Sequence, residues 1–237
     1  MKKSIIIASF FVSIFLFWVY NSISRGSAMS QFSRQELNFM GKVFKEYSNI
    51  YTNIFKHLYP AKNSTGFPER NLSVNFSKAY EKVATTKNQN AISWFEFQFG
   101  KKNDLHLDAI VMNTSSNELI LVESKRFNSG KKKIRQVGED IDRIYSCIKE
   151  LKKASQNSRI DLKNKYKKVY GVVLADVWPE TRLKKSILNA FQTKCFLTNF
   201  STIINSTNKI SGEKYYNCTF NLNNFPYHLV SFMWKIQ

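Results

Sequence analysis

Residues 105–126 constrain the fold of this chain more than any other stretch, because their pattern predicts two short strands joined by a polar turn. The first run, residues 105–112, is mostly apolar and is interrupted by one acid, Asp108. Residues 113–117 are all Asn, Ser and Thr, a composition typical of turns. The second run, residues 118–125, carries charge only at its ends, which favours a buried strand. Together they predict a β-hairpin.

The geometry of a hairpin brings particular side chains of this stretch together. Side chains alternate between the two faces of a strand, so Glu123 and Lys125 point the same way. A turn centred near Ser115 places Asp108 opposite Val122 or Glu123, and cross-strand neighbours lie roughly 5 Å apart. Two carboxylates at that separation repel each other unless a positive charge lies between them. A divalent cation meets this need, because Mg²⁺ binds one or two carboxylates together with waters and phosphate oxygens.

An acid on one strand and Glu-x-Lys at the end of the next resembles the PD-(D/E)XK nuclease superfamily, which has the restriction-endonuclease-like fold. Asp108 matches the first acid, Glu123 the second and Lys125 the lysine, while Leu107 replaces the usual proline. The resemblance implies that Asp108 and Glu123 bind Mg²⁺ or Mn²⁺, with the carbonyl of Ser124 as a further ligand. It also implies that Lys125 assists the attacking water. The alternative is an ordinary hairpin with a surface ion pair.

The expected order of elements supports the same fold. The pattern predicts a helix from Asn71 or Ser73 to about residue 87, the strand 91–99, the hairpin, a helix over 134–154 and a buried strand over 169–177. This order matches the αβββαβ core of the resembled superfamily. We therefore expect an α/β protein with a mixed central sheet flanked by helices.

Four regions are expected along the chain. They are an apolar segment over residues 1–28, a helical extension over 29–71, a nuclease-like core over 72–200 and a C-terminal extension over 201–237. In the extension, residues 31–59 have the apolar spacing of one or two helices that end before Pro60. Residues 181–191 and 194–197 predict a helix and a short strand, and the tail from residue 198 has only weak strand signals.

Three polar residues outside the hairpin are accessory candidates. Glu81 lies on the predicted helix before the sheet, where the resembled superfamily often carries an extra carboxylate. Glu96 lies in an aromatic strand, on the predicted face of Trp94 and opposite the face of Phe95, Phe97 and Phe99; a buried acid there is costly unless it is paired or functional. Gln136 matches a glutamine that some of these nucleases carry on the helix after the hairpin. For each candidate, a solvated or structural side chain is the alternative.

The net charge of +19, with a pI near 9.8, bounds the class of partner. Only Lys2, Lys3 and Arg25 of the basic residues precede residue 29, so the excess belongs to the rest of the chain. Such a charge favours nucleic acid or an anionic membrane surface; a lysine-rich, AT-biased genome is the alternative explanation. Four bases near the start of the predicted helix at residue 134 are expected to contact DNA phosphates: Lys131, Lys132, Lys133 and Arg135.

The N-terminal segment leaves several localisations open. Residues 5–20 are apolar and follow Lys2 and Lys3, which favours a membrane anchor with the domain on the non-cytoplasmic side. A signal peptide cleaved near residues 26–28 is the second interpretation, and a natural start at Met29 is the third.

The cysteines do not favour a metal site. The chain has three of them, far apart and without metal-ligand spacing, so structural zinc is not expected.

The sequence thus predicts a metal-dependent nuclease acting on DNA, and it leaves RNA as substrate and a homodimer open. Two alternatives belong to other classes. One is a non-catalytic basic module that binds nucleic acid, and the other is a membrane-tethered interaction protein.

Overall fold

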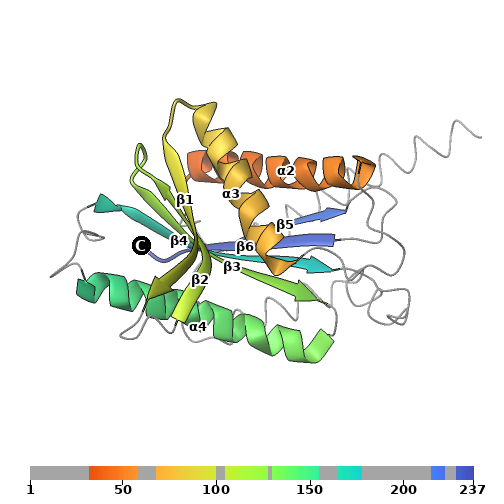
Figure 1. Ribbon diagram of the computed structural model, residues 1–237. Helices are drawn as coiled ribbons and strands as arrows, with labels where there is room; N and C mark the ends of the chain where they lie inside the picture. Colours follow the sequence, from red (N-terminus) through yellow and green to blue (C-terminus); the bar gives the residue numbers. More distant parts are fainter. Residues whose placement is uncertain are drawn as a thin grey trace, which may run out of the picture. The chain divides into compact units, whose positions relative to one another are not determined.

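A six-stranded mixed sheet carries the fold of the computed structural model, with strand order β1-β2-β3-β4-β6-β5 (Figure 1). The structure describes residues 32–57, 68–99, 105–127, 130–154, 165–177, 215–221 and 228–237. Its elements are α2 (Arg34–His57), α3 (Glu69–Thr85), β1 (Ala91–Phe99), β2 (Leu105–Asn113), β3 (Glu118–Phe127), α4 (Gly130–Ala154), β4 (Lys168–Val177), β5 (Tyr215–Asn221) and β6 (His228–Lys235).

Helices cover both faces of the sheet. β3 and β4 are parallel, whereas all other neighbouring strands are antiparallel. A parallel pair needs a long crossover, and the segment that contains α4 supplies it. α4 packs on one face in a core with Leu121 and Val173, and α2 and α3 pack on the other with Val122 and Val172 (Figure 1). The predicted α/β class with a mixed, helix-flanked sheet is confirmed.

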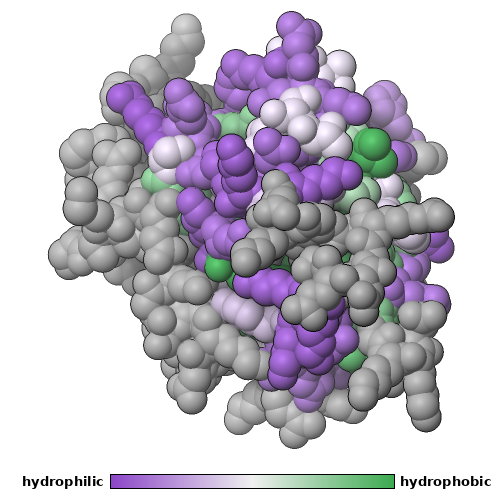
Figure 2. Space-filling model, turned by 90° about the vertical axis from the view of Figure 1, so that its left-hand side faces the viewer, coloured by the Kyte–Doolittle hydropathy of each residue, from purple (hydrophilic) through white to green (hydrophobic). Residues whose placement is uncertain are grey.

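Phe32–Gln237 form one compact unit, and Met1–Gln31 form another that lies outside the described residues. The predicted anchor or signal segment therefore also lies outside them, as do the helix predicted at 181–191 and the strand predicted at 194–197. No described helix is long and apolar enough to span a membrane. In Figure 2, hydrophilic side chains dominate the described part of the face on view, with isolated apolar residues between them.

The two N-terminal helices begin differently from each other. Ser33 and Glu36 form a capping box at the start of α2, in which each side chain accepts the other residue's backbone N–H. α3 begins at Glu69, directly after Pro68, which makes no side-chain cap hydrogen bond. The predicted cap at Asn71 or Ser73 is therefore wrong. Pro68 has no side-chain acceptor, and its backbone carbonyl instead accepts the N–H of Asn71 at 2.9 Å.

The hairpin of β2 and β3 has the predicted register. Its ladder runs from Asn113↔Glu118 to Ala109↔Val122, around a turn over residues 114–117. The side-chain carbonyl of Asn113 accepts the N–H groups of Ser115 and Ser116, which fixes the turn. Since the ladder ends at Ala109↔Val122, Asp108 is level with Glu123. Beyond this point β1 and β2 curve away from β3 toward α4 (Figure 1).

The faces of β1 were predicted only in part. Phe95 packs with the helices α2 and α3, whereas Phe97 and Phe99 pack on the α4 side. The residue between them, Glu96, has a φ of 51°, a left-handed conformation that is rare for a non-glycine residue in a strand. This turn of the backbone moves the following side chains to the other face. The prediction of one shared face for Phe95, Phe97 and Phe99 is therefore wrong.

β6 is an interior strand between β4 and β5. Its Trp234 is fully buried and lies directly against Gly171 of β4. A side chain on residue 171 would overlap the indole, so glycine is required there by space. The tail, whose residue pattern contains only weak strand signals, thus supplies part of the central sheet.

Candidate functional site

Asp108 lies where β2 parts from β3. Its Oδ2 accepts the backbone N–H of Ser124 at 2.6 Å, two residues beyond Val122, the last residue of β3 in the ladder with β2. A carboxylate therefore takes the hydrogen bond that a strand carbonyl would otherwise receive. This contact holds the side chain of Asp108 beside the stretch Glu123–Lys125, as the hairpin pattern predicted.

Glu123 and Lys125 both face α4, in agreement with their predicted shared face. The Oε1 of Glu123 accepts a hydrogen bond from Nη1 of Arg143 at 2.9 Å. The Nζ of Lys125 lies 3.2 Å from Oδ2 of Asp140. Arg143 Nη1 also lies 3.4 Å from Oδ1 of Asp140, one helical turn earlier on α4. Two acids and two bases thus form one connected cluster between β3 and α4.

Burial makes the ionised carboxylates of this cluster costly. Glu123 and Asp140 are each only 1% exposed. Burial raises the pKa of Glu123 to about 9, and the charge of Asp108 adds to the rise, although Arg143 opposes it. Burial likewise raises the pKa of Asp140, against the lowering effect of Lys125 and Arg143. Asp108 adds a third carboxylate to Glu123 and Asp140, whereas Lys125 and Arg143 are the only two cations of this cluster among the described residues. The three carboxylates therefore tend to retain one proton, which is distributed among coupled sites.

The surroundings of Asp108 add negative charge. Burial raises the pKa of Asp108, the N–H of Ser124 lowers it, and the charges of Glu96 and Glu69 raise it further. Glu69, at the first turn of α3, accepts the backbone N–H of Arg126 at 2.9 Å. Glu96 is exposed and its Oε2 lies 3.8 Å from Nε2 of His106. The structure thus places Glu69 and Glu96 within electrostatic reach of Asp108.

The other accessory candidates have different positions. Glu81 accepts a hydrogen bond from the Ser93 hydroxyl at 2.5 Å. It lies twelve residues after Glu69, roughly 18 Å along α3 at 1.5 Å per residue, so the structure does not bring it to Asp108. Gln136 lies one turn before Asp140 on α4, and its Oε1 is buried with no hydrogen-bond partner among the described residues. The backbone of the first turn of α4 carries the four predicted DNA-contacting bases, whose side chains lie outside the described residues: Lys131, Lys132, Lys133 and Arg135.

The fit of a metal ion can be judged from the donors themselves. Among the described residues, no group of three or more His, Cys, Asp or Glu side chains is arranged to hold one. The predicted set is smaller, with the carboxylates of Asp108 and Glu123 and the carbonyl of Ser124. These are hard oxygen donors, and Mg²⁺ accepts one or two carboxylates when waters complete its shell. The mutual repulsion of the buried Glu123 and the half-buried Asp108 is the kind of imbalance that a cation relieves, so the donor set fits.

No protein-family model, curated protein or solved structure matches this chain. The site is therefore interpreted from its own geometry.

Sequence reasoning missed Glu69, Asp140 and Arg143. Glu69 lies outside the helix that the sequence predicts, because the pattern starts that helix two or more residues later. Asp140 is the most informative omission, since it occupies a core-facing position between Val137 and Ile144 on an otherwise apolar stripe. An acid at such a position requires a buried partner. An acid at this core-facing position of the helix therefore indicates a partner on the sheet side.

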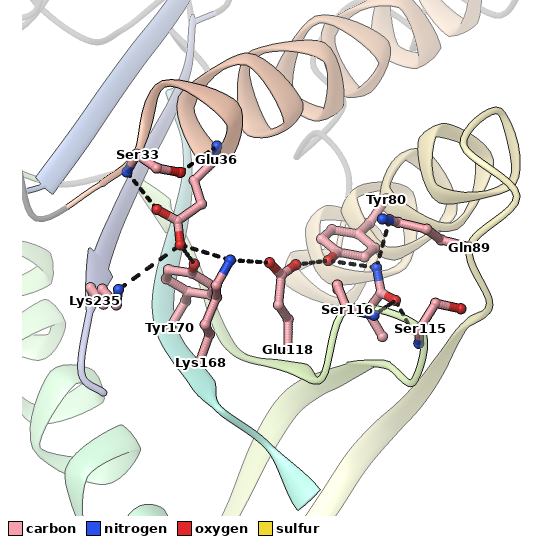
Figure 3. Close-up of polar contacts among 11 residues, drawn as sticks. Ser33, Glu36, Tyr80, Gln89, Ser115, Ser116, Glu118, Lys168, Tyr170 and Lys235 are labelled. Atoms are coloured by element: carbon pink, nitrogen blue, oxygen red, sulfur yellow. Dashed lines mark hydrogen bonds and ion pairs between the residues drawn. The ribbon is translucent and has the colours of Figure 1, made fainter.

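A second polar cluster lies at the other end of β3 and β4 (Figure 3). Glu36 accepts hydrogen bonds from the Tyr170 hydroxyl at 2.6 Å and the Ser33 N–H at 2.5 Å. The Nζ of Lys168 lies 3.1 Å from Glu36 and 3.3 Å from Glu118. Tyr80 donates to Glu118 at 3.0 Å. The cluster joins α2 and α3 to the sheet.

The second cluster borders a cavity of about 830 Å³ between α2, α3 and the start of β3 and β4. Both of its carboxylates are neutralised by neighbouring donors of the protein. Its position at the opposite ends of β3 and β4 separates it from Asp108. We therefore assign it a structural role and place the candidate functional site at Asp108, Glu123 and Lys125.

Proposed function

We propose that this protein is a metal-dependent nuclease of the PD-(D/E)XK type that hydrolyses phosphodiester bonds in DNA. The observation that carries the proposal is the position of Asp108, whose carboxylate accepts the Ser124 N–H and so lies beside Glu123. Lys125 shares the face of Glu123, as a lysine that acts at the same phosphate requires. The order α3-β1-β2-β3-α4-β4 supports the restriction-endonuclease-like core.

The residues have separate roles in this proposal. Asp108, Glu123 and the Ser124 carbonyl would hold Mg²⁺ or Mn²⁺. The bound cation would supply Lewis-acid stabilisation of the charge that develops at the phosphoryl group. Lys125 would orient the attacking water and neutralise charge in the transition state, and the burial of its side chain, which is 14% exposed, would strengthen these electrostatic effects. Asp140, 3.2 Å from the Lys125 ammonium, restricts where that ammonium points.

The excess of basic residues supports nucleic acid as the substrate class. With a net charge of +19, the protein attracts a polyanion over long distances. The bases at the start of α4 follow β3 directly in the chain, so the helix N-terminus provides a phosphate contact close in sequence to Lys125.

The test is a cleavage assay on the full-length protein. Linear, circular and single-stranded DNA, and RNA, are incubated with Mg²⁺, Mn²⁺ or EDTA. Asp108→Asn, Glu123→Ala and Lys125→Ala are compared with Glu150→Gln, which removes a partly exposed acid that pairs with Lys153 on α4. We expect metal-dependent cutting that falls about a hundredfold or more in the first three variants and stays unchanged in the fourth.

Other results of this assay would point elsewhere. Equal cutting by all four variants would mean that another site or a contaminant is responsible. Salt-sensitive DNA binding without any cutting would favour the non-catalytic binding module. That alternative has one observation in its favour, namely that Glu123 is already paired with a cation of the protein, Arg143.

A further inference from the structure

Arg143 contacts the buried acids of the candidate site and is itself partly exposed to solvent. Its Nη1 contacts two carboxylates at once, Glu123 at 2.9 Å and Asp140 at 3.4 Å. The two acids are almost completely buried, but the Arg143 side chain is 30% exposed. The Nη1 end of the Arg143 side chain therefore contacts the acids of the site, while another part of the side chain is in contact with solvent.

The position of Arg143 conflicts with that of a metal ion on Glu123. Its guanidinium neutralises the same carboxylate that the proposed nuclease uses as a ligand. A divalent cation and a guanidinium beside the same Glu123 oxygen repel each other, so the two compete for that position. Asp140 gives Arg143 a second contact that is independent of Glu123.

Lys125 differs from Arg143 in this respect. Its ammonium pairs with Asp140, and its side chain is only 14% exposed. Lys125 therefore has less freedom to leave the site. Arg143 combines partial exposure, at 30%, with a planar fork of donors, which matches the oxygens of a phosphate.

We infer that Arg143 is an exchangeable cation that neutralises Glu123 in the metal-free site and contacts the substrate phosphate once a divalent cation has bound. The inference rests on the proposed nuclease function, which it extends by a residue that links metal binding to substrate binding. Asp140 keeps Arg143 next to the site when Arg143 leaves Glu123, because Asp140 contacts Arg143 from the preceding helical turn. Arg143 thus positions substrate, and it also keeps the buried acids neutralised before metal arrives.

The first measurement is Mn²⁺ affinity without nucleic acid, by isothermal titration calorimetry on the full-length protein. Arg143→Ala should bind Mn²⁺ about tenfold more tightly than the unmodified protein, because the guanidinium no longer competes with the cation for the Glu123 carboxylate. Lys153→Ala is the matched control, since Lys153 also pairs with an acid three residues earlier on α4. Its Mn²⁺ affinity should not change.

The second measurement is DNA cleavage at saturating Mn²⁺. Arg143→Ala should cut at least tenfold more slowly than the unmodified protein despite its tighter metal binding. Arg143→Lys should cut at an intermediate rate, because it keeps the charge but not the fork. Opposite changes in metal affinity and cutting are the signature of exchange, whereas a purely structural role predicts that both decline together. Circular dichroism checks folding, and Arg143→Gln replaces the alanine variant if that variant unfolds.

The outcomes separate this inference from the function on which it rests. If the unmodified protein cuts DNA but Arg143→Ala binds Mn²⁺ no more tightly, the exchange is wrong and the nuclease remains. If Arg143→Ala binds Mn²⁺ more tightly yet cuts as fast as the unmodified protein, the contact with substrate is wrong. If the unmodified protein neither binds Mn²⁺ nor cuts, both the nuclease and the exchange are overturned.

Discussion

Replacing Glu36 by Gln should weaken the attachment of α2 to the sheet. Glu36 is 8% exposed and accepts hydrogen bonds from Tyr170 and Ser33, with the Lys168 ammonium 3.1 Å away. Burial alone would raise its pKa, but these donors outweigh burial and lower the pKa to about 2. The difference from the usual 4.5 corresponds to about 3 kcal/mol at about 1.4 kcal/mol per pKa unit. Because Gln still accepts one of the hydrogen bonds, we expect a loss of about 2 kcal/mol at pH 7.

The pH dependence of this loss follows from the direction of the shift. The folded protein holds the Glu36 proton less tightly than the unfolded chain does. The stabilisation is therefore complete above pH 4.5 and disappears as the pH falls toward 2. At pH 3 only about 1.4 kcal/mol of the contribution of ionised Glu36 remains, so the difference between the unmodified protein and Glu36→Gln should fall from about 2 kcal/mol at pH 7 to near zero.

Urea unfolding followed by circular dichroism at pH 7, 5 and 3 measures these differences. Glu46→Gln is the matched control on the same helix, since Glu46 pairs with Lys82 at 2.6 Å at the surface, where Lys82 is 66% exposed. An exposed pair of this kind contributes about 0–1 kcal/mol. Equal losses in both variants, or a loss in Glu36→Gln that does not change with pH, would refute the reasoning.

Two further predictions concern buried groups. Gly171→Ala should destabilise by about 1–3 kcal/mol, because its Cβ overlaps the Trp234 ring, and an unchanged urea midpoint would exclude that overlap. Burial raises the pKa of Cys147 to about 12, so iodoacetamide at pH 8 should modify it only after unfolding; peptide mapping by mass spectrometry gives the answer, and fast labelling of the folded protein would disprove the burial.

The hairpin was predictable from sequence because its determinants are local. The turn composition and the alternation of apolar residues fix which residues pair, and the observed Ala109↔Val122 pair agrees with the expected register. The shared face of Glu123 and Lys125 follows from the same alternation. These features depend on residues that are near one another in the chain, so they can be predicted from one sequence.

Features that depend on distant contacts were not predicted. The side-chain faces of β1 change at Glu96, whose positive φ no propensity indicates. Arg143 reaches Glu123 only because α4 crosses the sheet at a particular angle, which the sequence does not specify. The interior position of β6 also depends on a distant contact, because its partner β4 ends about fifty residues earlier in the chain. Tertiary packing decided each of these cases.

The interior position of β6 also bears on the order in which the protein folds. Pairing β4 with β6 closes the segment between residues 177 and 228, which is longer than the segment between residues 127 and 168 that pairing β3 with β4 closes. Closing a longer loop costs more entropy, so we expect β6 to dock late. Until it does, β4 exposes an apolar edge with unpaired backbone groups, a template for pairing with other chains. A chain at this stage carries Asp108, Glu123 and Lys125 and is also at its most prone to aggregate.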